Sequence, residues 1–496
     1  MKVSQVLKNG VLPGGLAGLA GGLVLAAAMY ELGRLDIFGQ MAGVISQLAG
    51  LVLVLAVSAL LGAGFGVLVW YQRPNAGETL VWGLVYGVFW WYLGRLTILP
   101  LFQGKGLTWD VDSARAAFPD LLGLILLGGI IGLVHVFLRR MLQVQAEDQQ
   151  AGRASLFQGA LAGLLSAYLL GVAADGQDQL FAFAGMAAGG SALAAWPVIL
   201  LIGLLAGVGF AWLFTDSTGG AGVGLIRGIA YGFFWWVAGG LTLVPLITGS
   251  GLVWTATEVQ IIFPTLPGYL LFGAAVALLY QWLGALIRLL FSEFLPGSSE
   301  EGLGTQGLRI VGRSGLAALV GGSLFSLVMW QTGFLPRVAD LIGSSSPVAG
   351  FIVHLAIAGL IGLSYGILFR RQSYDVGSAL GWGVSYGFFW AMLGPLTLMP
   401  VLLGGTPQWT ADAAASVFPN LIGHLGYGAG LGITFYLLEA RYSPWWIPRT
   451  EVQAARLERR KEQVQTSGPA LWTLLILLGL TLPVLLAKGQ GLTPVY

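Results

Sequence analysis

The feature that most constrains this chain is a series of long apolar runs, each of which can cross a lipid bilayer as a helix. A transmembrane helix needs about 20 apolar residues, because the hydrocarbon core is about 30 Å thick. The 496-residue sequence contains thirteen such runs, at about 11–30, 44–71, 79–102, 118–138, 155–173, 194–214, 226–248, 264–287, 313–332, 347–369, 379–403, 418–438 and 470–487. They are too continuously apolar for transmembrane strands, whose residues alternate. The sequence therefore predicts an all-α polytopic membrane protein.

The composition excludes several other classes of protein. Only 9% of the residues are charged, whereas a soluble domain carries roughly 25%. The chain has no cysteine, which excludes a disulfide-stapled fold and thiolate-ligated zinc, haem or iron–sulfur sites. The net charge of +2 is too small for nucleic-acid binding, so we expect no nucleic-acid partner.

Three segments of the chain share one pattern. They read WGLVYGVFWWYLGRLTILP from Trp82, RGIAYGFFWWVAGGLTLVP from Arg227 and WGVSYGFFWAMLGPLTLMP from Trp382. Each segment is followed by a tryptophan and then by a Phe-Pro pair at 118, 263 or 418. Such self-similarity indicates an internal repeat. We therefore predict three four-helix repeats, called here the first, second and third block, and one extra C-terminal helix.

The repeat also predicts the domain organisation. We expect the first block at 1–145, the second at 146–300 and the third at 301–440, then a basic linker at 441–468 and a C-terminal helix with its tail at 469–496. Four crossings per block give the blocks the same orientation, so the repeats are parallel. Many secondary transporters have inverted repeats, although parallel ones also occur in that class. The linker is either an interfacial helix on anionic headgroups or a solvated connection.

The third helix of each block predicts a packing face. At 100° per residue, its small residues, one tryptophan and one threonine fall on a single narrow stripe. A glycine face in a membrane helix marks the close approach of a neighbouring helix or a ligand. The stripe comprises Gly83, Gly87, Trp90, Gly94 and Thr97, then Gly228, Gly232, Trp235, Gly239 and Thr242, and finally Gly383, Gly387, Trp390, Gly394 and Thr397. The indole N–H of each stripe tryptophan needs an acceptor in a region without water.

A proline three residues after each stripe threonine predicts a kink or helix end near the outer face. These prolines are Pro100, Pro245 and Pro400, and each frees a backbone carbonyl four residues earlier. A bend that lines a substrate path is the alternative.

A short outer loop follows each proline and contains Trp109, Trp254 or Trp409, which we assign to the aromatic belt at the lipid headgroups. The sequence Thr255-x-x-Glu258 has the spacing of a capping box, and Asp112 and Asp412 are candidate helix caps. A ring of outer carboxylates that attracts a cation is the alternative.

Arg95 is the only charged residue well inside a predicted span. Intramembrane charges mark functional sites by default, and the other blocks have Gly240 and Pro395 at this position. Arg95 is thus a candidate for a single anion or partner site. The alternative is an arginine that extends toward the outer surface with its stem over Trp91.

The three histidines, His135, His354 and His424, do not recur at matching positions of the blocks. This argues against one haem or pigment per block. A single pigment or haem on one histidine remains open, but a buried, hydrogen-bonded histidine is the favoured interpretation. We predict no cofactor and no metal, and we expect bound lipid.

The loop charges predict the orientation of the chain. Eighteen of the 24 Lys and Arg residues lie on one side, five on the other and Arg95 within a span. The positive-inside rule then places the N-terminus in the cytoplasm and the C-terminus outside. We assign the protein to the plasma (inner) membrane of a bacterium.

No catalytic motif is present, and we expect no enzymatic activity. The acidic residues sit in loops or at helix ends, with Glu31 and Glu439 nearest to a span, which argues against ion-coupled transport. The first functional hypothesis is a non-enzymatic structural or accessory subunit of a larger membrane complex, for example a respiratory or photosynthetic one. The second is a transporter or channel for a small solute with a path between the repeats.

Overall fold

The structure of the protein is a computed structural model. It describes residues 3–41, 43–44, 46–71, 75–142, 152–175, 192–214, 220–291, 303–440, 450, 454, 457–458 and 467–487. Every regular element in these ranges is a helix, and no strand occurs in them. The expected basic linker at 441–468 and the tail beyond 487 lie almost entirely outside the described residues.

The chain divides into two compact units, residues 1–216 with 227–276 and residues 217–226 with 277–496. The helices of the first expected block are α1 (Val3–Val6), η1 (Leu7–Val11), α2 (Leu12–Glu31), α3 (Leu35–Met41), α4 (Gln47–Val69), α5 (Ala76–Trp90), η2 (Trp91–Ile98), α6 (Leu99–Phe102), α7 (Val111–Ala116) and α8 (Phe118–Leu142). Those of the second are α9 (Arg153–Asp175), α11 (Ala192–Leu213), α12 (Gly220–Trp235), η4 (Trp236–Leu243), α13 (Val244–Ile247), α14 (Ala256–Ile262), η5 (Phe263–Thr265) and α15 (Leu266–Phe291).

The third block and the C-terminal helix lie in the second unit. Their elements are α16 (Leu303–Gln331), α17 (Leu335–Ala339), η6 (Asp340–Ile342), α18 (Pro347–Phe369), α19 (Val376–Leu393), η7 (Gly394–Leu398), α20 (Met399–Leu402), α21 (Ala411–Ser416), α22 (Phe418–Ala440) and α24 (Gly468–Leu486).

Twelve helical stretches among the described residues are long and apolar enough to cross a membrane. The chain is therefore a multi-pass helical membrane protein. The expected fifth run, at 155–173, forms the 23-residue helix α9, which packs along α11 but is not one of the twelve. The count of thirteen spans stays a prediction.

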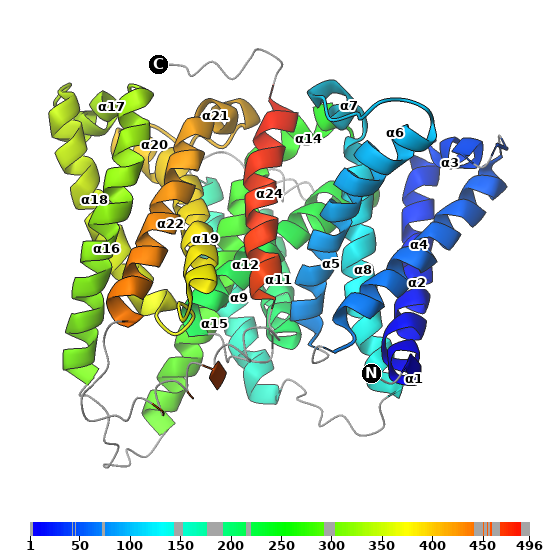
Figure 1. The fold of residues 1–496 in the computed structure, drawn as a ribbon, viewed down its shortest axis with the longest axis horizontal. Coiled ribbons are helices and arrows are strands. Elements are labelled where there is room, and N and C mark those ends of the chain that lie inside the picture. The colour runs from blue at the N-terminus through cyan, green and yellow to red at the C-terminus, as the bar shows by residue number, and fades with distance from the viewer. Residues whose placement is uncertain are drawn as a thin grey trace. The chain divides into compact units, whose positions relative to one another are not determined.

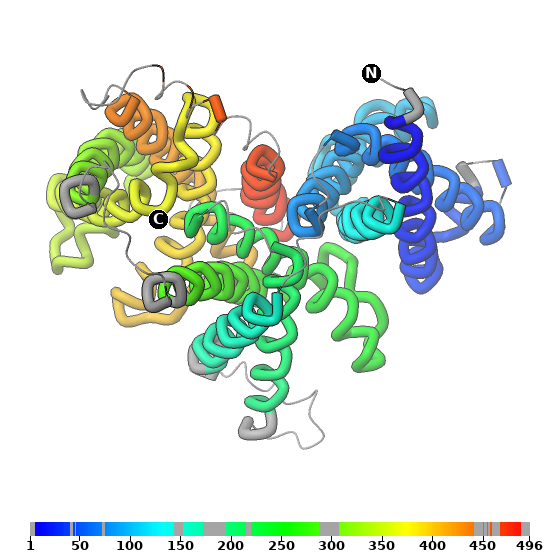
Figure 2. The backbone as a smooth tube through the Cα atoms, turned by 90° about the horizontal axis from the view of Figure 1, so that it is seen from below, coloured from blue at the N-terminus to red at the C-terminus, as the bar shows by residue number. Residues whose placement is uncertain are grey.

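The helices of the first and third blocks pack in the same order. In the first unit α4 contacts α2, α2 contacts α8, and α8 contacts α5 (Figure 1). In the second unit the corresponding series is α18, α16, α22 and α19, with α24 packed on α19 (Figure 2). In the first and third blocks the third helix thus packs on the fourth helix of its own block.

Glycine brings these third and fourth helices into backbone contact. A Cβ on Gly83 of α5 would overlap the carbonyl oxygen of Gly128 on α8, and a Cβ on Gly128 would overlap that of Gly83. Gly383 of α19 and Gly428 of α22 make the same reciprocal contact. In the second block, a Cβ on Gly273 would overlap the carbonyl oxygen of Gly228. Close packing of this kind is the main force between helices in lipid.

Candidate functional site

Each third helix widens into a π-helical segment before it ends. These segments are η2, η4 and η7, and a short α-helical turn with proline near its start follows each of them. The helix ends within two residues of Pro100, Pro245 or Pro400. Because a π-helix closes i→i+5 hydrogen bonds, the expected 100° per residue no longer holds beyond Trp91. The predicted stripe is therefore continuous only along the α-helical part.

The stripe threonines tie the outer loops to these π-helical segments. The Trp109 indole N–H donates to the Thr97 hydroxyl at 3.0 Å, and that hydroxyl donates to the Tyr92 carbonyl at 2.8 Å. The same two bonds join Trp254 to Thr242 and Trp409 to Thr397, and extend to the carbonyls five residues earlier. In each block one threonine hydroxyl thus accepts from the outer-loop indole and donates to a carbonyl of the widened helix turn.

The outer loop also satisfies the carbonyl that the proline frees. In the first block the Leu96 carbonyl accepts from the Thr108 N–H at 3.3 Å and from its hydroxyl at 3.1 Å. In the third block the Leu396 carbonyl accepts from the Gln408 N–H at 2.7 Å. A helix end at membrane depth needs such partners, because lipid offers none.

Arg95 forms an ion pair with Asp120 at the start of α8. Its Nε lies 2.6 Å from Asp120 Oδ2, and Arg34 Nη2 lies 3.1 Å from the same oxygen. The Asp120 side chain is 7% exposed, whereas those of Arg95 and Arg34 are 31% and 23% exposed. Two guanidinium groups thus share one buried carboxylate, and the cluster carries one net positive charge.

Sequence reasoning missed Asp120 and Arg34 as partners of Arg95. Asp120 is 25 residues away in sequence and lies on another helix, so spacing alone gives no contact. The available signal was the residue two positions after each Phe-Pro phenylalanine, which is polar in every block: Asp120, Thr265 and Asn420. The Arg95 guanidinium is bonded to a carboxylate, which neither of the two expectations included.

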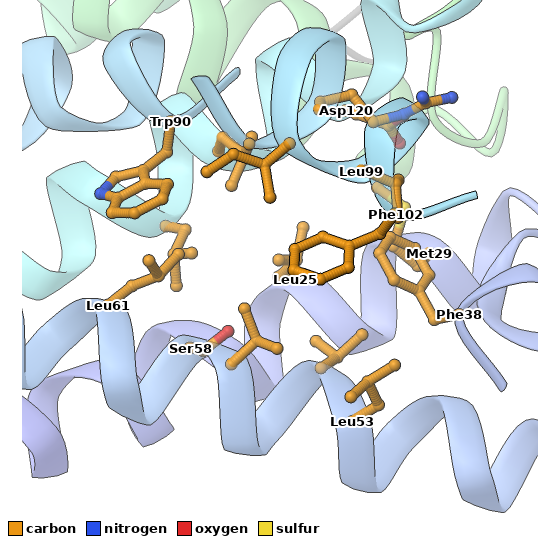
Figure 3. Close-up of a pocket in the computed structure, with 17 residues that line it drawn as sticks. Leu25, Met29, Phe38, Leu53, Ser58, Leu61, Trp90, Leu99, Phe102 and Asp120 are labelled. Atoms are coloured by element: carbon orange, nitrogen blue, oxygen red, sulfur yellow. The ribbon is translucent and has the colours of Figure 1, made fainter. Parts of the chain in front are cut away.

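A cavity of about 320 Å³ lies beside this ion pair in the first block. Its walls come from α2, α3, α4, α5, η2, α6 and α8, and most of its lining is aliphatic or aromatic. Figure 3 shows Trp90 and Leu61 at one end and Asp120 and Phe102 at the other. The lining comprises Leu25, Met29, Phe38, Leu53, Val54, Val57, Ser58, Leu61, Trp90, Gly94, Arg95, Ile98, Leu99, Phe102, Asp120, Leu124 and Leu127.

The predicted stripe of the first block therefore serves two purposes. Gly83 and Gly87 contact the α8 backbone, whereas Trp90 and Gly94 line the cavity. The Trp90 Nε1 has no hydrogen-bond partner among the described residues, and the same is true of Trp235 and Trp390. The hydroxyls of Tyr86, Tyr231 and Tyr386, four residues earlier, interact with these indoles as acceptors of poor geometry.

In the third block, histidines stand at positions that line the cavity in the first. His354 and His424 correspond to Val54 and Leu124, and both rings contact Phe325, with centroids at 4.9 and 4.5 Å. The His354 Nδ1 is 2.8 Å from the Ser326 hydroxyl. The His424 Nδ1–H donates to the Asn420 carbonyl at 2.8 Å, which leaves Nε2 as an acceptor. Sequence reasoning did not bring these two histidines together, because they lie on different helices.

His135 occupies a different environment, in the interior of the first unit. Its side chain is fully buried on α8, with its ring edge-on to Phe65 at 6.1 Å. Neither ring nitrogen has a hydrogen-bond partner among the described residues. The expectation of a hydrogen-bonded histidine is therefore not met at this position. No group of three or more His, Asp or Glu residues that could hold a metal occurs in the described part of the chain.

The outer tryptophans differ in exposure. Trp109 is 65% exposed, as expected of an aromatic belt, but Trp254 is fully buried. The position of a Cβ on Gly123 of α8 lies 3.4 Å from the Trp254 ring. The Trp254 ring therefore does not face the lipid headgroups, because it packs against a helix of the preceding block.

One of the three short outer helices is capped as expected, and the other two are capped by different residues. The capping box of Thr255 and Glu258 is confirmed at the start of α14. Asp110 and Thr410, and not Asp112 and Asp412, are the N-caps of α7 and α21. The Asp110 carboxylate accepts from the Ser113 N–H at 2.8 Å, and this bond lowers the Asp110 pKa.

A second buried ion pair joins Glu78 at the start of α5 to Arg227 on α12. Both side chains are less than a tenth exposed, and the Arg227 guanidinium lies 5.6 Å from the centre of the Phe214 ring. Glu78 and Asp120 are therefore buried acids within spanning helices. Glu31 and Glu439 also lie within spanning stretches, so the expectation that these two acids are nearest to a span is incomplete, because it omits Glu78 and Asp120.

These features define a multi-pass helical membrane protein whose first block holds an apolar cavity next to a partly buried ion pair. No protein-family model matches the chain. Neither a curated protein nor a solved structure is significantly similar to it.

Proposed function

We propose that the protein is a non-enzymatic structural or accessory subunit of a larger membrane complex, built from three parallel four-helix repeats and one further helix. The proposal places the chain in a bacterial inner membrane with its N-terminus in the cytoplasm and its C-terminus outside. The distribution of Lys and Arg supports this orientation. We propose a respiratory or photosynthetic complex as this assembly.

The observation that carries the proposal is that matching polar groups are used to hold helices together. Tyr86, Tyr231 and Tyr386 each donate to a carbonyl of the second helix of their block, at 2.8, 2.8 and 2.5 Å. The stripe threonines and outer tryptophans bond to each other in the same way. Polar side chains that bond to the protein itself support a scaffold more than a hydrated path.

The outward faces support the presence of partner subunits. Leu60 of α4 and Leu360 of α18 occupy corresponding positions and are 73% and 70% exposed. Val52 and Ile352, on the same two helices, are 60% and 62% exposed. Such faces need lipid or another membrane helix as a neighbour.

The test is purification of the full-length chain from its native membrane in a mild detergent. We expect other membrane subunits to co-purify in fixed ratio. Leu60→Ala and Leu360→Ala each shorten one outward face and keep it apolar, and we expect one of them to release the partner. A chain that purifies alone and drives solute flux in liposomes would contradict the proposal.

A transporter or channel is the second candidate, favoured by the ion pair between Arg95 and Asp120 at one end of the cavity. In this case Arg95→Leu should abolish solute flux in proteoliposomes. Lys105→Gln, which removes a positive charge from the exposed outer loop, is the matched control. An unchanged rate in Arg95→Leu would remove this role of Arg95.

A further inference from the structure

The cavity and the unusual charges occur in the same block. Arg95 and Asp120 are replaced by Gly240 and Thr265 in the second block and by Pro395 and Asn420 in the third. The cavity-lining Leu124 of α8 has larger polar counterparts, Tyr269 and His424.

Those larger side chains reach the π-helical segment. The Tyr269 hydroxyl lies 3.2 Å from where a Cβ on Gly240 would stand, and His424 Nε2 lies 3.6 Å from a Cβ on Gly394. Phe325, which takes the place of Leu25, packs on the His424 ring. Leu124 and Leu25 are shorter, and the cavity lies at their positions. The block with the shorter side chains at these two positions is thus the block that carries the charges.

The cavity is open toward the lipid. Val57 and Phe102 line it, and they are 44% and 87% exposed. Its volume of about 320 Å³ falls in the range of ligand sites, which are mostly apolar with a few polar groups at fixed places. An alkyl chain from the surrounding bilayer fits both the lining and the access.

The end of the cavity that contains Arg95 and Asp120 determines which headgroup the ligand can carry. Arg34 and Arg95 share one carboxylate, which leaves an excess of positive charge. Arg95 uses only its Nε in the bond to Asp120, and its two Nη atoms carry four further N–H donors. Guanidinium groups bind phosphate through paired hydrogen bonds. The cluster is therefore suited to an anionic headgroup above an apolar tail.

We propose that the first-block cavity binds one acyl chain of an anionic phospholipid, with the phosphate at Arg95 and Arg34. Trp90 and Leu61 then face the far end of the chain, and Asp120 holds the two guanidinium groups in place. The site is independent of the proposed subunit function, because lipid binding is measured on the isolated chain.

The test measures lipids retained by the purified full-length protein. The protein is transferred to bilayer nanodiscs of equal parts phosphatidylglycerol and phosphatidylcholine and then released for native mass spectrometry. We expect one retained phosphatidylglycerol. Arg95→Gln should lower the preference for it over phosphatidylcholine about tenfold, the loss of one hydrogen bond to a charged group. Lys105→Gln should leave the preference unchanged.

Filling variants test the cavity itself. Leu25→Phe introduces the side chain of the third block and Leu124→Tyr that of the second, and together they should remove the retained lipid. Leu324→Phe, on the exposed side of α16, is the control for an added ring. Equal retention of both lipids by the wild type, retention of a free fatty acid instead, or full retention by the filled variant would overturn the proposal.

Photocrosslinking keeps the test valid if the filled variant does not fold. A phosphatidylglycerol with a diazirine near the chain end should label the wild-type protein on α4 near Ser58 and Leu61. An excess of unlabelled phosphatidylglycerol should suppress this labelling, and inorganic phosphate should not. Labelling spread evenly over the exposed helices would overturn the site.

Discussion

The backbone contact between the third and fourth helices, called here the seam, predicts opposite effects on stability for alanine substitutions at two glycines that lie two residues apart on α22. A Cβ on Gly428 would overlap the Gly383 carbonyl oxygen, whereas a Cβ on Gly426 would meet nothing within 4 Å. Replacing Gly by Ala in a helix interior stabilises the helix by roughly 1 kcal/mol through intrinsic propensity, and this gain is the same at either position. This contribution therefore cancels when Gly428→Ala is compared with Gly426→Ala, and the difference between the two variants isolates the clash.

The clash involves main-chain atoms, so no change of side-chain rotamer relieves it and the two helices must separate. Overpacking of this kind costs typically 1–3 kcal/mol. We expect Gly428→Ala to be less stable than Gly426→Ala by roughly 2–3 kcal/mol, toward the upper end of that range. Gly426→Ala itself should equal or exceed the wild type in stability.

The measurement is equilibrium unfolding of each purified variant in mixed micelles, followed by the loss of helical circular dichroism. The wild type is measured alongside to fix the sign of both changes. If Gly428→Ala proves as stable as Gly426→Ala, the helices are not held in backbone contact at Gly383, and the seam as described is wrong.

Three further predictions concern polar contacts. Glu78→Gln or Arg227→Gln alone should cost about 3–5 kcal/mol, because each breaks this buried ion pair by removing one partner; the double variant should cost less than the sum, as a double-mutant cycle of unfolding free energies will show. Thr97→Val removes the hydroxyl between the outer loop and η2 and should cost about 1 kcal/mol, with Thr97→Ser restoring most of the thermal midpoint. The folded-state pKa of Asp110 is lowered, so its cap stabilises α7 above the ordinary aspartate pKa and is lost as the pH falls through the folded-state value. The protection of the α7 amides, expressed relative to their intrinsic exchange rate at each pH, should therefore fall in acid, and Asp110→Asn should remove this dependence.

The apolar runs were sufficient to predict the class of protein and most of the helix positions. The thickness of the hydrocarbon core sets a minimum length for every spanning helix. Each helix can therefore be predicted from its own stretch of sequence, without knowledge of its neighbours. The contacts of Thr97 and Trp109 were also within reach, since their twelve-residue spacing recurs in each block. The widening of the helix after Trp90 was not, because π-helical hydrogen bonding has no distinct residue pattern here beyond the later proline.

Only one part of the candidate site, Arg95, could be predicted from the sequence. Arg95 stands out because it is a charge within an apolar run, but its counter-ion depends on how α8 packs beside η2. The cavity is less predictable still. It arises from what Leu25 and Leu124 fail to fill, and a void becomes evident only when the same positions carry Phe325 and His424 elsewhere in the chain.

The π-helical segment has a mechanical consequence for the outer surface. A shift of one residue in its hydrogen-bond register corresponds to a rotation of about 100°. If Trp91–Ile98 were rewound as an ordinary α-helix, Thr97 would swing away from the Trp109 indole and Arg95 from its carboxylate in a single movement. The outer loop and the ion pair therefore both depend on the conformation of one eight-residue stretch of backbone.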